Sequence, residues 1–162
     1  VFENLPLLAE QLNNIELREK VMYGAFLSAI ALMNSGTGPA AAMSYPLGVH
    51  FGVPHGIGGG IFLPHVIKHN ISAGFLDYAD LMNIKDLNYT KDKSAKIFIE
   101  KMLAKWQQLN IPRDLRKFGM EAKHIDLFKK EVMDLHMALN QNPVPFGKEE
   151  ISKVLGELIV NK

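Results

Sequence analysis

Four of the chain's six histidines fall in residues 50–69, at His50, His55, His65 and His69. Neutral imidazole is the commonest nitrogen ligand for protein-bound metal ions, so this cluster is a candidate metal centre. On a helix, His65 and His69 would share one face because they are four residues apart. No carboxylate occurs between Glu19 and Asp77, so a metal ion here would need an acidic ligand from elsewhere in the fold. We therefore interpret His65 and His69 as capping, packing or surface residues, with a metal site as the alternative.

The same segment is rich in glycine, with Gly56 followed by Gly58, Gly59 and Gly60. Each glycine in a helix costs about 1 kcal/mol relative to alanine, so this run needs a physical reason. Bare backbone allows either a neighbouring helix or a bound ligand to approach closely. The residues alone leave these two interpretations open.

Helical periodicity predicts the elements that must position these residues. Apolar residues recur at spacings of three and four, in stripes that predict amphipathic helices over roughly 16–34, 98–109, 125–139 and 151–158. The first of these helices is predicted to carry one apolar face, and Trp106 on the second is expected to be a core residue. His124 and His136, at the third, are assigned to its surface or packing.

Two further helices are predicted around the histidines themselves, over segments 40–52 and 54–71. Pro46 and Pro64 lie inside them and are expected to kink them or to shift their starts. A short helix near 75–82 precedes a polar loop. No run alternates with period two, so the sequence predicts no sheet. The fold class is therefore all-α, a multi-helix bundle of seven or eight helices forming a single domain over residues 1–162.

The bulk composition excludes several classes of protein. A formal net charge of +1 over 162 residues argues against nucleic acid or an anionic membrane surface as a partner. The absence of cysteine excludes disulfides, thiol nucleophiles and cysteine metal sites, and it fits a reducing cytoplasm. No apolar run reaches the roughly 18 residues of a membrane-spanning helix, and the first residues lack the pattern of a signal peptide. We expect a globular, cytoplasmic protein.

The stretch PHGIGGGIFLPHVIKHN, residues 54–70, carries a distinctive pattern. Pro-His-Gly is followed by small residues, then by Leu-Pro-His-Val and a final asparagine. This pattern resembles the second signature of the iron-containing (group III) alcohol dehydrogenases, which belong with the dehydroquinate synthase-like proteins. Residues 45–48 (YPLG) stand where the family has a histidine-Pro-Leu-Gly turn, while IPRDL at 111–115 and Asn142-Pro143 resemble later family segments. The resemblance covers nearly the whole chain.

The resemblance implies a fold and an activity. Family members are NAD(P)-dependent, use iron or zinc, and transfer a hydride between the nicotinamide and an alcohol or aldehyde carbon. They carry a dinucleotide-binding domain followed by an all-helical metal domain, whose first helix supplies an aspartate and a histidine to the metal. This chain matches only the helical domain after that helix, and it has no glycine-rich phosphate loop. We expect it to be the C-terminal portion of a two-domain enzyme, without a nucleotide site of its own.

The resemblance also marks site residues. It places one metal ligand at His55, and it places the cofactor-binding backbone at Gly58, Gly59 and Gly60, facing the nucleotide-binding domain. A second family ligand lies fourteen residues before His55, and that position is Ala41. Alanine offers no lone pair, so the resemblance implies a degenerate metal site.

A third family position, ten residues before His55, normally holds a histidine near the nicotinamide and is Tyr45 here. Two interpretations of these changes compete. In the first, which we favour, the metal has been abandoned and Tyr45 is a catalytic residue that polarises a carbonyl or relays a proton. In the second, the metal is kept and His50 or another residue replaces the lost ligand. Tyr45 as a plain packing residue is a further alternative.

Two functions of different classes follow. The first is the C-terminal domain of an alcohol dehydrogenase-like oxidoreductase, inactive alone, whose partners are a small-molecule substrate and the missing nucleotide-binding domain. The second is a stand-alone, non-catalytic helical scaffold or interaction module. In that case, exposed apolar surface at the place of the missing domain would drive homo-oligomer formation.

Overall fold

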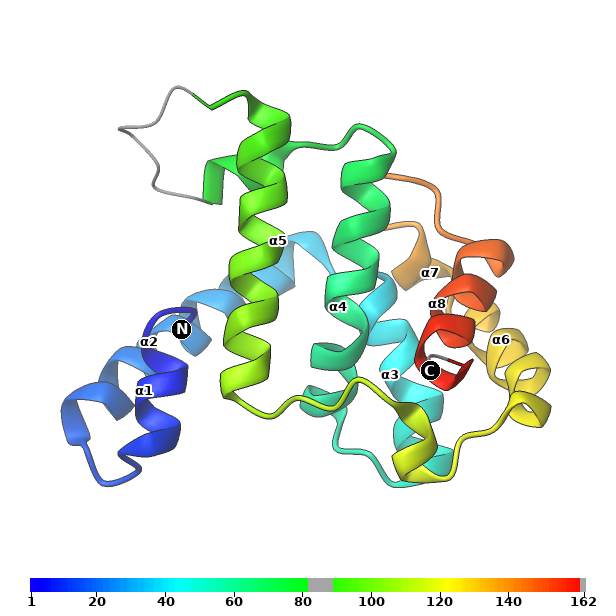
Figure 1. Ribbon diagram of the computed structural model, residues 1–162, viewed down its shortest axis with the longest axis horizontal. Coiled ribbons are helices and arrows are strands. Elements are labelled where there is room, and N and C mark those ends of the chain that lie inside the picture. The colour runs from blue at the N-terminus through cyan, green and yellow to red at the C-terminus, as the bar shows by residue number, and fades with distance from the viewer. Residues whose placement is uncertain (82–88, 161–162) are drawn as a thin grey trace.

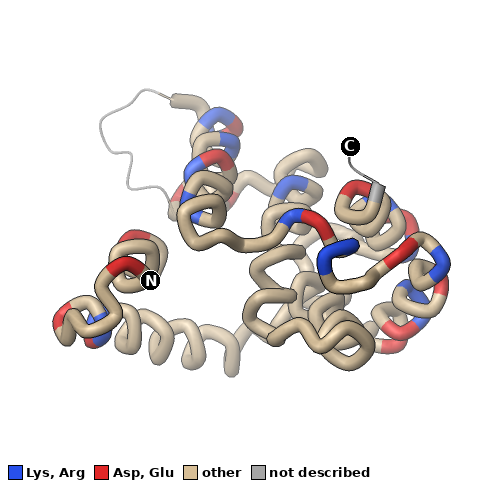
Figure 2. The backbone as a smooth tube through the Cα atoms, turned by 60° about the horizontal axis from the view of Figure 1, so that its bottom comes forward, with Lys and Arg blue, Asp and Glu red and all other residues tan. Residues whose placement is uncertain are grey.

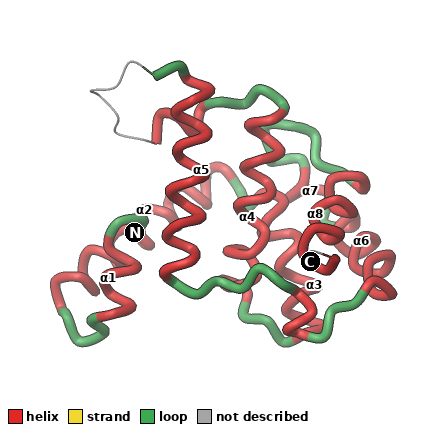
Figure 3. The backbone as a smooth tube through the Cα atoms, viewed as in Figure 1, coloured by secondary structure: helices red, strands yellow, loops and turns green. Residues whose placement is uncertain are grey.

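The computed structural model describes residues 1–81 and 89–160. These residues form helices and connecting turns with no β-strand, which confirms the predicted all-α class (Figures 1 and 3). The α-helices of this part of the chain are α1 (Asn4–Glu10), α2 (Ile15–Ser35), α3 (Gly38–Phe51), α4 (His55–Ser72), α5 (Lys91–Gln108), α6 (Ile125–Asp134), α7 (His136–Leu139) and α8 (Lys148–Val160). Short 3-10 turns cover 77–81, 115–118 and 122–124. Most of the predicted polar loop, and the end of the helix expected near 75–82, lie outside the described residues.

Helix α4 is the centre of the fold and lies between α5 on one side and α8 on the other (Figure 1). Phe62 and Val66 join a large core with residues of α3, α6 and α8. Ile67 and Ile71 join a second core formed largely with α5. Because α4 is covered on two sides, most of its circumference must be apolar. None of the described helices combines the length and apolarity needed to cross a bilayer.

Helices α3 and α4 form a hairpin through a tight glycine turn. Gly52 adopts φ +65°, a left-handed conformation that glycine accepts without strain, and its N–H donates to the Gly48 carbonyl at 3.1 Å. The chain then reverses through the buried Val53, and α4 begins at His55. The two predicted helices around the histidines are thus confirmed, and they pack along each other.

Pro64 lies inside α4, and Trp106 supplies the hydrogen-bond donor that this proline lacks. Proline has no N–H, so the carbonyl of Gly60, four residues earlier, lacks its usual helical donor. The indole Nε1 of Trp106 on α5 donates to that oxygen at 2.6 Å. Trp106 was predicted as a core residue; it packs against the second core but is only half-buried.

The predicted helix over 16–34 exists as α2, and its apolar residues are not covered by the described part of the chain. No residue of α2 is buried, and large side chains such as Met22, Phe26 and Met33 are 60% to 87% exposed. After Lys20, apolar residues occur on all sides of α2. Among the described elements, α2 packs mainly on α1. Figure 2 shows charged residues in the first turns of α2 and then none along the rest of α2, α3 and the start of α4, a gap that extends from Lys20 to Lys68 in the sequence.

The single helix predicted over 125–139 is divided into α6 and α7 in the structure. Leu135 has φ −86° and ψ 39°, which ends α6 and separates it from the short α7. The apolar stripe survives the break, since Phe128, Val132 and Leu139 are all buried in the large core. A local break that preserves the buried face is invisible to periodicity.

A pair of amides, Asn70 and the half-buried Asn142, fastens the end of α4 to the segment between α7 and α8. Asn70 is fully buried, and its Nδ2 donates to Asn142 Oδ1 at 2.9 Å and to the Tyr78 hydroxyl at 2.7 Å. In return, Asn142 Nδ2 donates to Asn70 Oδ1 and to the Val144 carbonyl, both at 2.7 Å. This network satisfies polar groups that would otherwise be costly to bury.

Candidate active site

Tyr45 and His55 lie side by side on the outside of the α3–α4 hairpin. Their ring centroids are 4.8 Å apart, with the ring planes inclined at 49°. Tyr45 is 54% exposed, and His55, the first residue of α4, is also exposed. Ala41 lies one turn before Tyr45 on α3. The structure therefore gathers on one surface the three positions that the family resemblance marked.

Ser44 contacts both Ala41 and His55, and these contacts determine the tautomer of the His55 ring. It is fully buried, and its Oγ lies 2.7 Å from the Ala41 carbonyl oxygen and 2.7 Å from His55 Nδ1. A carbonyl oxygen only accepts, so the single hydroxyl proton goes to Ala41, and the second contact requires a proton on His55 Nδ1. His55 is thus the Nδ1–H tautomer. Its unprotonated Nε2, 3.5 Å from Ser44 Oγ, is the ring atom left to accept a proton or bind an ion.

Replacing Ser44 by alanine is expected to release this tautomer. Imidazole ¹⁵N shifts of His55 at pH 8.5 should report Nδ1–H in the native chain and a mixture that includes Nε2–H in Ser44→Ala. Ser35→Ala is the matched control, because Ser35 also donates to a helical carbonyl, at 2.9 Å from Ala31, but touches no histidine. An Nε2–H signal in the native chain would contradict the assignment.

Within the glycine run, Gly58 is required for close helix packing, whereas Gly59 has open space beside it. A β-carbon at Gly58 would lie 2.9 Å from Ser44 Cβ and 3.3 Å from Ser44 Cα, so only glycine allows α3 and α4 to approach this closely. A β-carbon at Gly59 would meet nothing within 4 Å, and one at Gly60 would make ordinary contacts with Trp106 and Ile111. The predicted cofactor-binding role of Gly58, Gly59 and Gly60 stays a prediction.

His50, the alternative ligand, is engaged by α6 instead. Its Nε2 lies 2.8 Å and 3.0 Å from the two carboxylate oxygens of Glu131. His124 packs edge-on against Phe51 with ring centroids 5.2 Å apart, and His136 is exposed. The assignment of these last two to packing and surface is confirmed.

His65 and His69 share the outer side of α4 but take separate partners. His65 Nδ1 lies 3.0 Å from a carboxylate oxygen of Glu157 on α8. His69 Nε2 donates to the Pro145 carbonyl at 2.9 Å, and its ring meets Phe146 edge-on. Both histidines thus fasten α4 to neighbouring segments, as the packing interpretation expects.

Toward a family-type metal, this chain supplies one imidazole at His55 and no donor at Ala41. Protein-bound zinc takes three or four side-chain donors. Among the described residues, no three His, Cys, Asp or Glu side chains gather closely enough to hold an ion. The neighbours of His55 are a hydroxyl that is already engaged, a phenol, and Ala41, whose side chain has no donor.

Comparison with known proteins identifies the family. The model of the Fe-containing alcohol dehydrogenase family, C-terminal, matches residues 1–159. The chain belongs to the iron-containing alcohol dehydrogenase family. A 1,3-propanediol dehydrogenase of Klebsiella pneumoniae is 33% identical over 147 residues, which are 88% of this chain and 37% of that protein. An NADPH-dependent butanol dehydrogenase of Clostridium saccharobutylicum is 26% identical over 144 residues, 86% of this chain and 37% of that one.

The fold of the family's C-terminal domain is confirmed as well. A solved 1,3-propanediol oxidoreductase matches with a TM-score of 0.88 over 98% of this chain and 42% of its own, at 23% identity. The chain therefore spans little more than a third of the length of the iron-containing alcohol dehydrogenases it matches. The family motif pointed to Tyr45 and His55, which the structure brings together, but gave no indication of Ser44. The one local signal for Ser44 is its place beside Tyr45, and the contact with His55 spans eleven residues.

Proposed function

We propose that this chain is the C-terminal domain of a cytoplasmic NAD(P)-dependent oxidoreductase that interconverts an alcohol and an aldehyde, with a degenerate metal site. Family membership and the two dehydrogenase relatives support the reaction class. The chain alone is expected to be inactive, because the nucleotide-binding domain of the family is not part of the matched segment.

The observation that carries this proposal is the surface of α2. Between residues 21 and 35 this helix has no charged residue, yet none of its side chains is buried. A helix that is apolar on all sides is normally found inside a protein. Its exposed large residues include Tyr23, Phe26, Leu27 and Ile30. Such a surface supports a longer protein in which a further domain covers α2.

Tyr45 and His55 are the polar side chains that this chain would contribute to the reaction. The nicotinamide, when bound, accepts or supplies the hydride. The phenol O–H of Tyr45 would donate a hydrogen bond to the substrate oxygen as negative charge develops there. In alcohol oxidation, the unprotonated Nε2 of His55 would accept the hydroxyl proton. Ser44 would keep that nitrogen available by holding the proton of the ring on Nδ1.

The degenerate metal site can be tested by restoring the missing ligand. The native chain is expected to bind Zn²⁺ weakly, because His55 is its one imidazole donor there. Ala41→His adds a second imidazole and should raise the affinity by about tenfold or more, in a calorimetric titration. Met22→His, which places an exposed imidazole on α2, should leave the affinity unchanged.

Stoichiometric iron or zinc in the native chain that disappears in His55→Ala would overturn the degenerate site. Turnover of 1,3-propanediol or butanol by the isolated chain with NAD or NADP would overturn the claim that it is inactive alone. A reading frame that continues upstream into a dinucleotide-binding domain would support the two-domain enzyme.

The exposed surface of α2 also favours one alternative, a non-catalytic module that associates through this helix. In that case, light scattering should show concentration-dependent dimers of the native chain. Replacing the exposed Phe26 and Met33 by glutamate should convert them to monomers. A monomeric native chain at high concentration would remove this alternative.

A further inference from the structure

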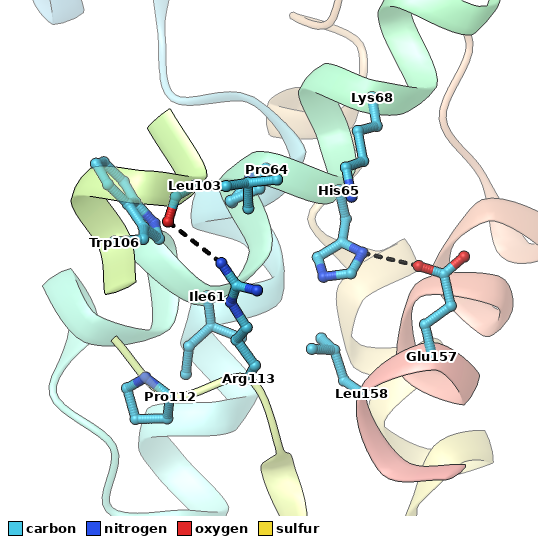
Figure 4. Close-up of a pocket in the computed structure, with 10 residues that line it drawn as sticks. All are labelled: Ile61, Pro64, His65, Lys68, Leu103, Trp106, Pro112, Arg113, Glu157 and Leu158. Carbon is cyan, nitrogen blue, oxygen red and sulfur yellow. Dashed lines mark hydrogen bonds and ion pairs between the residues drawn. The ribbon is translucent and has the colours of Figure 1, made fainter. Parts of the chain in front are cut away.

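A polar cavity lies along α4 beyond the Tyr45–His55 site. Its volume is about 200 Å³, and its walls come from α4, α5, α8 and the segment after α5. Figure 4 shows Arg113 near its centre, with Trp106 and Leu103 on one side and His65 on the other. Nothing in the proposed oxidoreductase reaction uses these groups, so the cavity stands independently of that proposal.

Arg113 brings unused hydrogen-bonding capacity into this cavity. One guanidinium nitrogen, Nη2, donates to the Leu103 carbonyl at 3.2 Å, which holds the side chain in place. A guanidinium carries five N–H donors in a planar fork that suits two oxygens of a carboxylate or phosphate. Most of these donors have no protein acceptor among the described residues.

His65 supplies a second group that responds to charge. Because Glu157 accepts from Nδ1, the neutral ring carries its lone pair on Nε2. Burial lowers the pKa of His65, against an opposing effect of Glu157, while Lys68 and Arg113 lower it further. The ring is therefore neutral near pH 7. An anion beside it would raise that pKa and draw a proton onto Nε2.

The balance of charge around the cavity favours an anion. Lys68 lines it from α4, and no ion pair joins that amino group to a carboxylate in the described part of the chain. The single lining carboxylate, Glu157, lies beyond the His65 ring from Arg113 and is paired with that ring (Figure 4). An adjoining cavity adds Lys153 and Glu150, which offset each other.

We propose that this cavity binds the oxyanion group of a small ligand, held by Arg113 and Lys68, with the apolar part of the ligand against Trp106 and Leu158. The oxyanion could belong to a carboxylate or a phosphate, so both are tested. Butyrate and inorganic phosphate serve as probes at constant ionic strength, because screening alone would otherwise change with concentration.

Trp106 is the chain's single tryptophan and lines the cavity, so its fluorescence reports binding without a label. Saturable quenching or enhancement is expected with at least one probe in the millimolar range. Arg113→Gln should weaken that binding by about tenfold or more, since it removes a charge-assisted fork. Lys68→Gln should weaken it less, as it removes a single point charge. The better probe assigns the ligand group as carboxylate or phosphate.

Lys101→Gln is the matched control, because Lys101 is an exposed lysine of α5 outside this cavity. It should leave binding unchanged. Butyrate binding should also tighten from pH 8 to pH 6, and this pH dependence should vanish in His65→Gln, because proton uptake is lost. No saturable response to either probe at tens of millimolar would overturn the site. The site would also be overturned if Arg113→Gln and Lys101→Gln bound the probe with equal affinity while the circular dichroism of each variant was native.

Discussion

Replacing Asn70 by leucine is expected to lower the free energy of unfolding by about 3–5 kcal/mol. The change empties a fully buried amide site, leaves the half-buried Asn142 amide with only its Val144 partner, and leaves the half-buried Tyr78 hydroxyl without its donor. Each buried polar group left without a partner costs about 1–3 kcal/mol. Urea unfolding followed by circular dichroism would measure the loss as a lower midpoint with an unchanged slope.

A double-mutant cycle with Asn142 separates the pair from its surroundings. Asn70→Leu together with Asn142→Leu should lower the free energy of unfolding by less than the sum of the two single changes, because neither amide is then left without its partner. Strict additivity would contradict the coupling inferred from the reciprocal hydrogen bonds at 2.7 Å and 2.9 Å.

Adding one methyl group at Gly58 should destabilise the protein, while the same change one residue later should not. Gly58→Ala places a β-carbon 2.9 Å from Ser44 Cβ, where neither helix has a flexible side chain to move away. Overpacking of this kind costs about 1–3 kcal/mol, more than the roughly 1 kcal/mol that alanine gains in helix propensity. Gly59→Ala meets no atom within 4 Å and should stabilise α4 by up to about 1 kcal/mol.

Thermal unfolding of the two variants measures this difference directly. A lower midpoint for Gly58→Ala and a higher one for Gly59→Ala are expected. The ¹⁵N signals of His55 add a second readout, since a displaced Ser44 would loosen its contact with Nδ1. Equal midpoints in the two variants would show that the α3–α4 hairpin relaxes easily at Gly58, contrary to its close packing.

Local patterns predicted much of the fold because most of its determinants lie close together in the chain. The α3–α4 hairpin follows from two apolar segments separated by Gly52 and Pro54, and the family motif pointed to Tyr45 and His55. The contacts that complete the sites are distant. Ser44 reads as an ordinary helical serine, and Glu157 lies 92 residues from His65.

The exposure of α2 was beyond prediction for a different reason. Its apolar spacing predicts a helix with an apolar surface, but it does not indicate which part of a protein packs against that surface. Trp106 shows the same limit on a smaller scale. Its place on an apolar stripe predicts burial, but not the hydrogen bond from its indole to the carbonyl that Pro64 leaves free.

The uncharged surface of α2 after Lys20 has a consequence for biosynthesis. In the longer relatives, the matched segment is the C-terminal one, so α2 would leave the ribosome after the domain proposed to cover it had been made. Domains generally fold in order of synthesis, and a prefolded neighbour would shield α2 as soon as it emerged. Translated without that neighbour, the helix would present a chaperone-binding sequence, and yields of the isolated chain should rise when chaperones are co-expressed.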